Sequence, residues 1–132
     1  MFHPARELLA SRFSFTATGL EVVGRDCEYR MISRGKGIES VTLLGGFKRG
    51  EYFEVEVERM AGSGCVAVGV AEKERSVEKH KLPGWGEGSC GYHSDDGRKF
   101  ISDSYGEAYG PAFKEGDRVG CGWMKGIVFF TK

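Results

Sequence analysis

The residues that could perform chemistry gather in the second half of the chain, and Cys90 and His93 are the first pair to consider. Their C-x-x-H spacing occurs in zinc sites, but a structural zinc ion needs four ligands, and the other candidates, His80 and Cys121, stand alone. A cysteine nucleophile and its histidine base would have to lie within hydrogen-bond reach. Residues three apart on a strand point to opposite faces. The spacing therefore argues against both a metal site and a catalytic dyad.

Two further patterns are an acidic pair and a glycine-rich run. Asp95 and Asp96 could serve acid–base catalysis, but adjacent aspartates before a glycine are more often turn formers. The glycines at positions 84, 86 and 88 loosely resemble a phosphate-binding loop, but the G-K-[S/T] sequence and the following helix are missing. The sequence thus predicts no catalytic residue, no cofactor and no metal ion, and we do not expect an enzyme.

The segment Leu82-Pro83-Gly84-Trp85 is the remaining candidate for a functional site. Proline and glycine favour a tight turn, which places the tryptophan in a loop. Such a tryptophan can fold inward as a lid on the core. Alternatively it can anchor a partner, because tryptophan is enriched among interface residues whose truncation costs roughly 2 kcal/mol or more. The sequence leaves both roles open.

The clearest strand pattern in the chain is a strict alternation of apolar and acidic residues. In residues 52–58, Phe53, Val55 and Val57 share one face and three glutamates share the other, as in a strand with one face in the core. Residues 65–71 are apolar on both faces and contain small residues, which is typical of a central strand. A glycine turn separates the two runs, so we expect them to form an antiparallel hairpin.

The rest of the chain shows the same kind of pattern. Further strands are predicted at residues 13–16, 20–23, 29–32, 40–44, 89–93, 99–102, 118–123 and 127–130. Asp95-Asp96-Gly97 and Lys125-Gly126 are predicted to make tight turns between neighbouring strands. Only residues 6–10 favour a helical turn, and the charged segment 72–81 is expected to be a solvated loop. Short strands with glycine turns indicate an all-β antiparallel sandwich or barrel.

Composition narrows the function classes. Lysine and arginine number 19, as do aspartate and glutamate, so nucleic acid is not the expected partner. No apolar run approaches the ~20 residues of a membrane span. The N-terminus does not resemble a signal peptide, so we expect an intracellular protein, in the cytoplasm or the nucleus. Four widely spaced cysteines are then expected to be small buried apolar residues rather than disulfide partners.

Several motifs in order closely resemble a known family, the SPRY domain. They comprise residues 51–57, 68–71, the Leu82-Pro83-Gly84-Trp85 loop, residues 89–100, 109–113, 116–122 and 129–132. The resemblance is strongest from about residue 50 to the end, and residues 13–49 fit the weaker opening strands of the family. It implies an antiparallel, bent β-sandwich without catalytic activity, whose edge loops bind a peptide or a protein surface as an adaptor or scaffold.

The resemblance also indicates which residues form the binding surface. The candidates lie in the loop and in the hairpin that follows it: Leu82, Pro83, Trp85, His93, Asp95, Asp96, Arg98, Lys99 and Phe100. Some of these positions are expected to support the loops rather than contact the ligand. The expected partner is a protein or peptide, and other subunits of a large complex are a further possibility.

The resemblance finally predicts the domain limits. Residues 1–12 are expected to be an N-terminal extension and residues 13–132 the SPRY domain. The family pattern continues with further strands beyond the match to residues 129–132, so the sandwich is expected to be incomplete at its C-terminal end. Either the chain is a fragment, or another polypeptide supplies the missing strands by strand addition. In the second case the chain would be a structural subunit built permanently into a larger assembly.

Overall fold

The computed structural model describes residues 48–60, 64–72, 82–102 and 105–132 with their side chains, together with the backbone of five strands before residue 45. These early strands are β1 (Phe2–His3), β2 (Ser14–Thr18), β3 (Leu20–Arg25), β4 (Glu28–Ser33) and β5 (Ser40–Leu44). The described part of the chain contains strands, turns and loops without a helix. This confirms the predicted all-β class, and within the described residues no helix is long and apolar enough to cross a membrane.

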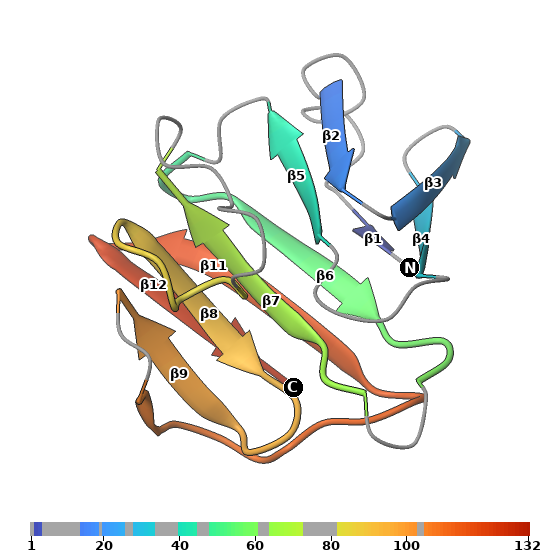
Figure 1. The fold of residues 1–132 in the computed structure, drawn as a ribbon. Helices are drawn as coiled ribbons and strands as arrows, with labels where there is room; N and C mark the ends of the chain where they lie inside the picture. The colour runs from blue at the N-terminus through green and yellow to red at the C-terminus, as the bar shows by residue number, and fades with distance from the viewer. Residues whose placement is uncertain are drawn as a thin grey trace.

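Two antiparallel sheets form the body of the molecule (Figure 1). The larger sheet has the order β12-β11-β6-β1-β4-β3, and the smaller has the order β10-β9-β8-β7. The later strands are β6 (Tyr52–Glu56), β7 (Ala67–Ala71), β8 (Ser89–His93), β9 (Arg98–Ile101), β10 (Glu107–Ala108), β11 (Arg118–Met124) and β12 (Ile127–Thr131). Strands β2 and β5 pair separately.

The core lies between the two sheets. Val119 and Cys121 of β11 are fully buried, and Tyr92 of β8 packs toward them from the smaller sheet. The Tyr92 ring lies 5.0 Å from the ring of Phe113 and 5.6 Å from that of Phe130. This packing confirms a sandwich, because inward-facing residues from two sheets meet in one apolar layer.

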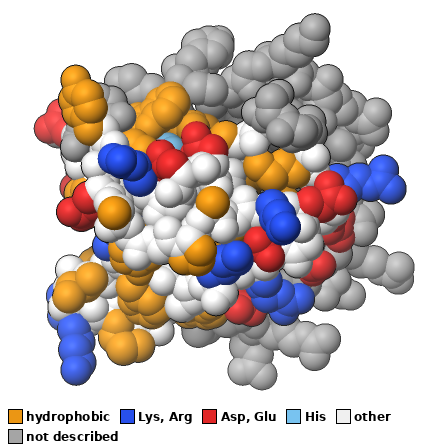
Figure 2. Space-filling model, turned by 90° about the horizontal axis from the view of Figure 1, so that it is seen from below, with side chains coloured by type: hydrophobic (Ala, Val, Ile, Leu, Met, Phe, Trp, Pro, Cys, Tyr) orange, Lys and Arg blue, Asp and Glu red, His pale blue; other side chains and the backbone are white. Residues whose placement is uncertain are grey.

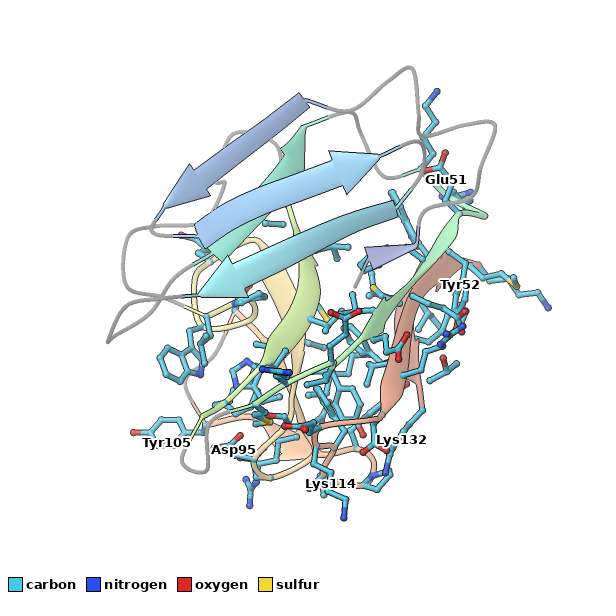
Figure 3. All side chains as sticks on the ribbon, turned by 90° about the vertical axis from the view of Figure 1, so that its right-hand side faces the viewer. Glu51, Tyr52, Asp95, Tyr105, Lys114 and Lys132 are labelled. Carbon is cyan, nitrogen blue, oxygen red and sulfur yellow. The ribbon has the colours of Figure 1, made fainter. Side chains whose placement is uncertain are left out.

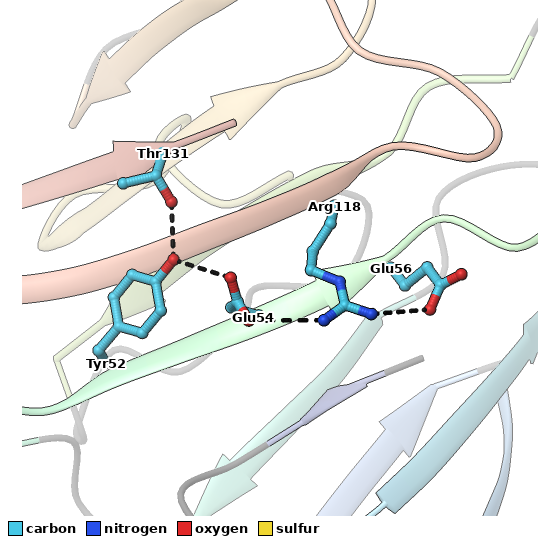
Figure 4. A network of polar contacts seen from close by, with 5 residues as sticks. All are labelled: Tyr52, Glu54, Glu56, Arg118 and Thr131. Atoms are coloured by element: carbon cyan, nitrogen blue, oxygen red, sulfur yellow. Dashed lines mark hydrogen bonds and ion pairs between the residues drawn. The ribbon is translucent and has the colours of Figure 1, made fainter.

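The outer face of the larger sheet carries a polar network (Figure 4). The Tyr52 hydroxyl donates its single hydrogen to Glu54 at 3.2 Å. It can therefore only accept from the Thr131 hydroxyl, which lies at 2.7 Å. Arg118 lies between Glu54 and Glu56 at 3.8 Å and 3.4 Å. Because these ion pairs are exposed, each contributes at most about 1 kcal/mol. The alternation predicted for residues 52–58 is confirmed, with glutamates outside and Phe53 and Val55 packed against the core.

One predicted pairing is wrong. The strands at residues 52–58 and 65–71 do not form a hairpin: β6 pairs with β11 and β1, whereas β7 pairs with β8 in the other sheet. Glycines between two strand patterns predict a reversal of the chain, but they do not indicate whether the next strand joins the same sheet or the opposite one. Strand β1 falls within residues 1–12, for which an N-terminal extension is predicted, and it lies between β6 and β4.

The two predicted tight turns are confirmed. Strands β8 and β9 pair through the Asp95-Asp96-Gly97 turn, in which Gly97 has a φ of 68°. Strands β11 and β12 pair through Lys125 and Gly126, with φ values of 53° and 75°. Positive φ at both central residues fits the twist of a two-residue hairpin. The predicted helical turn at 6–10 and the charged segment 73–81 lie outside the described residues.

Candidate ligand-binding surface

The 82–85 loop, Leu82-Pro83-Gly84-Trp85, is a tight turn closed by a hydrogen bond from the Trp85 amide to the Leu82 carbonyl at 3.1 Å. Proline at the second position and glycine with a φ of 97° at the third are typical of a type II turn. The Ser89 hydroxyl fixes the loop to the start of β8, because it accepts from the Gly84 amide at 2.9 Å and donates to the Gly86 carbonyl at 2.6 Å.

The loop lies directly on the outer face of the smaller sheet. Gly69 of β7 and Gly91 of β8 are paired on that face, and Pro83 covers both. A Cβ atom at Gly91 would lie 2.1 Å from the Pro83 carbonyl oxygen, and one at Gly69 would lie 2.8 Å from Pro83 Cβ. The paired glycines therefore provide the space in which the loop rests, since any other side chain would collide with it.

His93 at the end of β8 supports the same loop from below. Its Nε2 lies 2.8 Å from the Pro83 carbonyl oxygen, and because a carbonyl can only accept, Nε2 carries the proton. The imidazole stacks on Phe100 with ring centroids 4.0 Å apart and lies 5.7 Å from the Trp85 ring. Only 2% of His93 is exposed, so its position is that of a support for the loop.

The hairpin turn after β8 positions two carboxylates beside the loop. Buried Ser94 anchors the turn, because its amide donates to the Val66 carbonyl and its hydroxyl accepts from the Val66 amide, at 2.9 Å and 2.8 Å. Asp96 accepts from the Arg98 amide at 2.9 Å and lies 3.9 Å from Arg98 Nε. Asp95 is exposed and accepts a hydrogen bond from the Cys65 thiol at 3.4 Å.

The loop and the turn enclose an open recess of about 350 Å³. All the predicted site residues except Pro83 and Lys99 line it, and two further residues join them. The full lining comprises Cys65, Leu82, Trp85, His93, Asp95, Asp96, Arg98, Phe100 and Tyr105. Figure 2 shows hydrophobic, basic and acidic side chains close together on one face of the molecule. In Figure 3, Asp95 and Tyr105 lie at one end of the molecule, away from Glu51 and Tyr52.

Pro83 and Lys99, the two predicted site residues that do not line the recess, lie elsewhere in the smaller sheet and its loop. Pro83 lies beneath the turn, against the sheet. Lys99 is paired with Tyr92 across β8 and β9 and points between the sheets, where only 9% of it is exposed. Its ammonium donates to the Val128 carbonyl at 2.6 Å and lies 5.2 Å from the centre of the Tyr109 ring. The structure therefore brings Lys99 into the core rather than to the recess.

Trp85 combines features of both predicted roles. The residue is half-buried and packs near His93, as a lid would, yet it also lines the recess. Its indole Nε1 is buried and is the one such side-chain atom in the described part of the chain that has no hydrogen-bond partner. An unsatisfied buried donor costs about 1–3 kcal/mol.

The cysteines separate into two environments. Cys90 and Cys121 are buried in the core, as predicted, and burial raises the pKa of Cys121 to about 12. Cys90 faces this core while His93 faces the loop, so the two do not meet. Cys65 is exposed, contrary to the prediction, because it precedes β7 instead of belonging to it. These three thiols are free, and Cys27 lies outside the described residues.

Cys65, His93 and Asp95 are the described residues that could hold a metal ion. One ligand atom from each lies within 4.8 Å of the others, and three protein ligands would leave a fourth position open to the recess. Partial burial of the Cys65 thiol raises its pKa, and the thiol donates a hydrogen bond to Asp95. Because cysteine binds metals as the thiolate, binding here would require the loss of the thiol proton.

Sequence reasoning missed Cys65 and Tyr105 as lining residues. Tyr105 is 81% exposed, and its carbonyl accepts from Arg98 Nη1 at 3.3 Å. An aromatic residue between a serine and a glycine signals an exposed loop, and this could have suggested Tyr105. No comparable signal pointed to Cys65, whose position depends on how β7 enters the smaller sheet.

The structure thus defines a β-sandwich that supports a recessed, aromatic and acidic surface formed by the 82–85 loop and the β8–β9 hairpin. A family model described as the SPRY domain matches residues 51–132, and the chain therefore belongs to the SPRY domain family. SPRY domains are protein-interaction modules. The matched region contains all of the residues that line the recess.

Several known proteins are similar to this chain. Ran-binding protein 9 of Mus musculus is 39% identical over 83 residues, which cover 61% of this chain and 12% of that protein. Ran-binding protein 10 of Danio rerio is 39% identical over 83 residues and is covered to 13%. SPRY domain-containing protein 3 of Homo sapiens is 37% identical over 109 residues, which cover 80% of this chain and 24% of that protein. The chain thus spans less than two thirds of these relatives.

Proposed function

We propose that this chain is a non-catalytic adaptor or scaffold module, acting inside the cell, that binds a peptide or protein surface in the recess beside Trp85. The observation that carries the proposal is the recess itself. Residues of the 82–85 loop and of the β8–β9 hairpin line it, and the loop rests on the paired glycines Gly69 and Gly91. The volume of the recess falls within the range of about 300–1,000 Å³ that is usual for ligand pockets. Apolar walls with a few polar groups are also usual for such sites.

Trp85→Ala tests this proposal. We expect peptides selected from a random library on the wild-type chain to bind the variant at least about 30-fold more weakly, because truncation of an interface hot spot costs about 2 kcal/mol or more. Calorimetric titration gives the affinities, and denaturant unfolding of the same samples shows whether the fold persists. Unchanged affinity in a folded variant would contradict the proposal, and loss of cooperative unfolding would favour the lid role.

Ile127→Ala is the matched control and also addresses a second function. Ile127 is 61% exposed and is paired with Met124, 53% exposed, at the tip of the β11–β12 hairpin. This apolar tip on the outermost strand of the larger sheet favours a contact with another subunit. If peptide binding depends on Ile127 and not on Trp85, the hairpin is the binding surface, and the chain acts as a structural subunit.

A further inference from the structure

The charges around the recess are unevenly matched. Arg98 lies 3.9 Å from the Asp96 carboxylate and also donates to the Tyr105 carbonyl at 3.3 Å. The charges of Arg98 and Asp96 therefore largely offset one another. Asp95 remains as the third charged residue of the lining, and within the described part of the chain no cationic side chain pairs with it.

The surroundings of Asp95 leave its charge in place. Among the described residues, the one hydrogen-bond partner of its carboxylate is the Cys65 thiol, 3.4 Å from Oδ1. Because the thiol donates its hydrogen in this contact, it is uncharged and neither compensates nor adds to the negative charge. The side chain of Asp95 is exposed to solvent at the edge of the recess, where an incoming cation can reach it.

Aromatic side chains form the adjoining wall. Trp85 and Phe100 line the recess from the loop and from β9, and Tyr105 stands 81% exposed at its rim. Aromatic faces attract cations, and they also cover the aliphatic stems of lysine and arginine. A carboxylate that no described cationic side chain pairs with, beside the half-buried Trp85 ring and the exposed Tyr105 ring, is thus complementary to a long cationic side chain.

We propose that the recess selects peptide segments in which a lysine or arginine pairs with Asp95 while a neighbouring apolar side chain packs against Trp85. This inference rests on the proposed function and adds the chemical class of the ligand. It assigns Asp95 and Tyr105 to recognition of the cationic residue, and Trp85 and Leu82 to the apolar one. Arg98 restricts the choice further, because it disfavours a second cation beside Asp96.

Selection from a random peptide library on the intact 132-residue chain tests the inference. We expect the wild-type chain to enrich peptides with lysine or arginine next to a large apolar residue. Asp95→Asn should abolish that enrichment and weaken a selected peptide by about threefold to tenfold, between the effects of an exposed ion pair and of a charge-assisted hydrogen bond. Asp95→Lys should enrich aspartate and glutamate instead. Glu54→Gln, an exposed carboxylate on the opposite sheet, is the control and should change nothing.

The outcomes separate this inference from the proposed function. Peptides that depend on Trp85 but show no basic preference, or bind equally well to a folded Asp95→Asn variant, would overturn the inference and leave the binding function intact. Peptides that bind independently of Trp85 would overturn the proposed function. A library without any binder to the wild-type chain would contradict both. Loss of the basic preference at high salt would support the inference, because exposed charges are screened.

Discussion

Gly91→Ala is expected to displace the 82–85 loop from the sheet and to lower both the stability and the ligand affinity of the chain. The new Cβ would lie 2.1 Å from the Pro83 carbonyl oxygen and 2.6 Å from the Pro83 carbonyl carbon. Backbone atoms of the loop would have to move, which also breaks the bond between Pro83 and His93. Overpacking of this kind costs about 1–3 kcal/mol, and occasionally more.

Denaturant unfolding measures the stability loss, and titration with a library-selected peptide measures the affinity. Ala71→Val is a suitable control, because it adds volume to the same pair of strands at an exposed position. A Gly91→Ala variant that unfolds at the wild-type denaturant concentration would show that the loop does not rest on the glycine pair. Loss of affinity without loss of stability would show that the loop can move without disturbing the sandwich.

His93→Ala is expected to have the second large effect. The substitution removes a ring that is 98% buried between Phe100 and Trp85, and it leaves the Pro83 carbonyl without its donor. A large-to-small change in a core costs about 2–5 kcal/mol, to which a lost hydrogen bond adds. We therefore expect a destabilisation of several kcal/mol, measured by denaturant unfolding, together with weaker peptide binding.

His93→Gln distinguishes the two contributions of this histidine. The glutamine amide can still donate to the Pro83 carbonyl, so this variant should recover part of the stability and most of the loop geometry. If His93→Ala instead keeps the wild-type stability but loses the peptide, the imidazole contacts the ligand directly. That result would contradict the supporting role that its 2% exposure assigns to it.

The strands were predictable where one face is apolar and the other polar. Residues 52–58 and 118–123 show this alternation, and β6 and β11 occupy those segments. The Pro83-Gly84 turn and the Asp95-Asp96-Gly97 turn were predictable from the conformations that these residues favour. What a local pattern does not contain is the partner of each strand, and for this reason the predicted hairpin between β6 and β7 was wrong.

The candidate site was predictable in composition and less so in geometry. The family resemblance placed most of the lining residues together, although the sequence does not show that the loop folds back onto Gly69 and Gly91. The direction of Lys99 depends on the register of β9 against β8, which pairs it with buried Tyr92. A single sequence does not specify this register, so it did not indicate that Lys99, a candidate binding residue, lies in the core.

Mapping the bound peptide onto the chain is the most direct test of the central claim that the recess is the binding surface. Backbone amide resonances of the isotope-labelled chain would be followed while a library-selected peptide is added. We predict that the largest shifts fall on residues 82–102 and on Tyr105, which line or support the recess. Shifts concentrated on the outer face of the larger sheet, at Tyr52 and Arg118, or on the Met124–Ile127 hairpin, would contradict the claim.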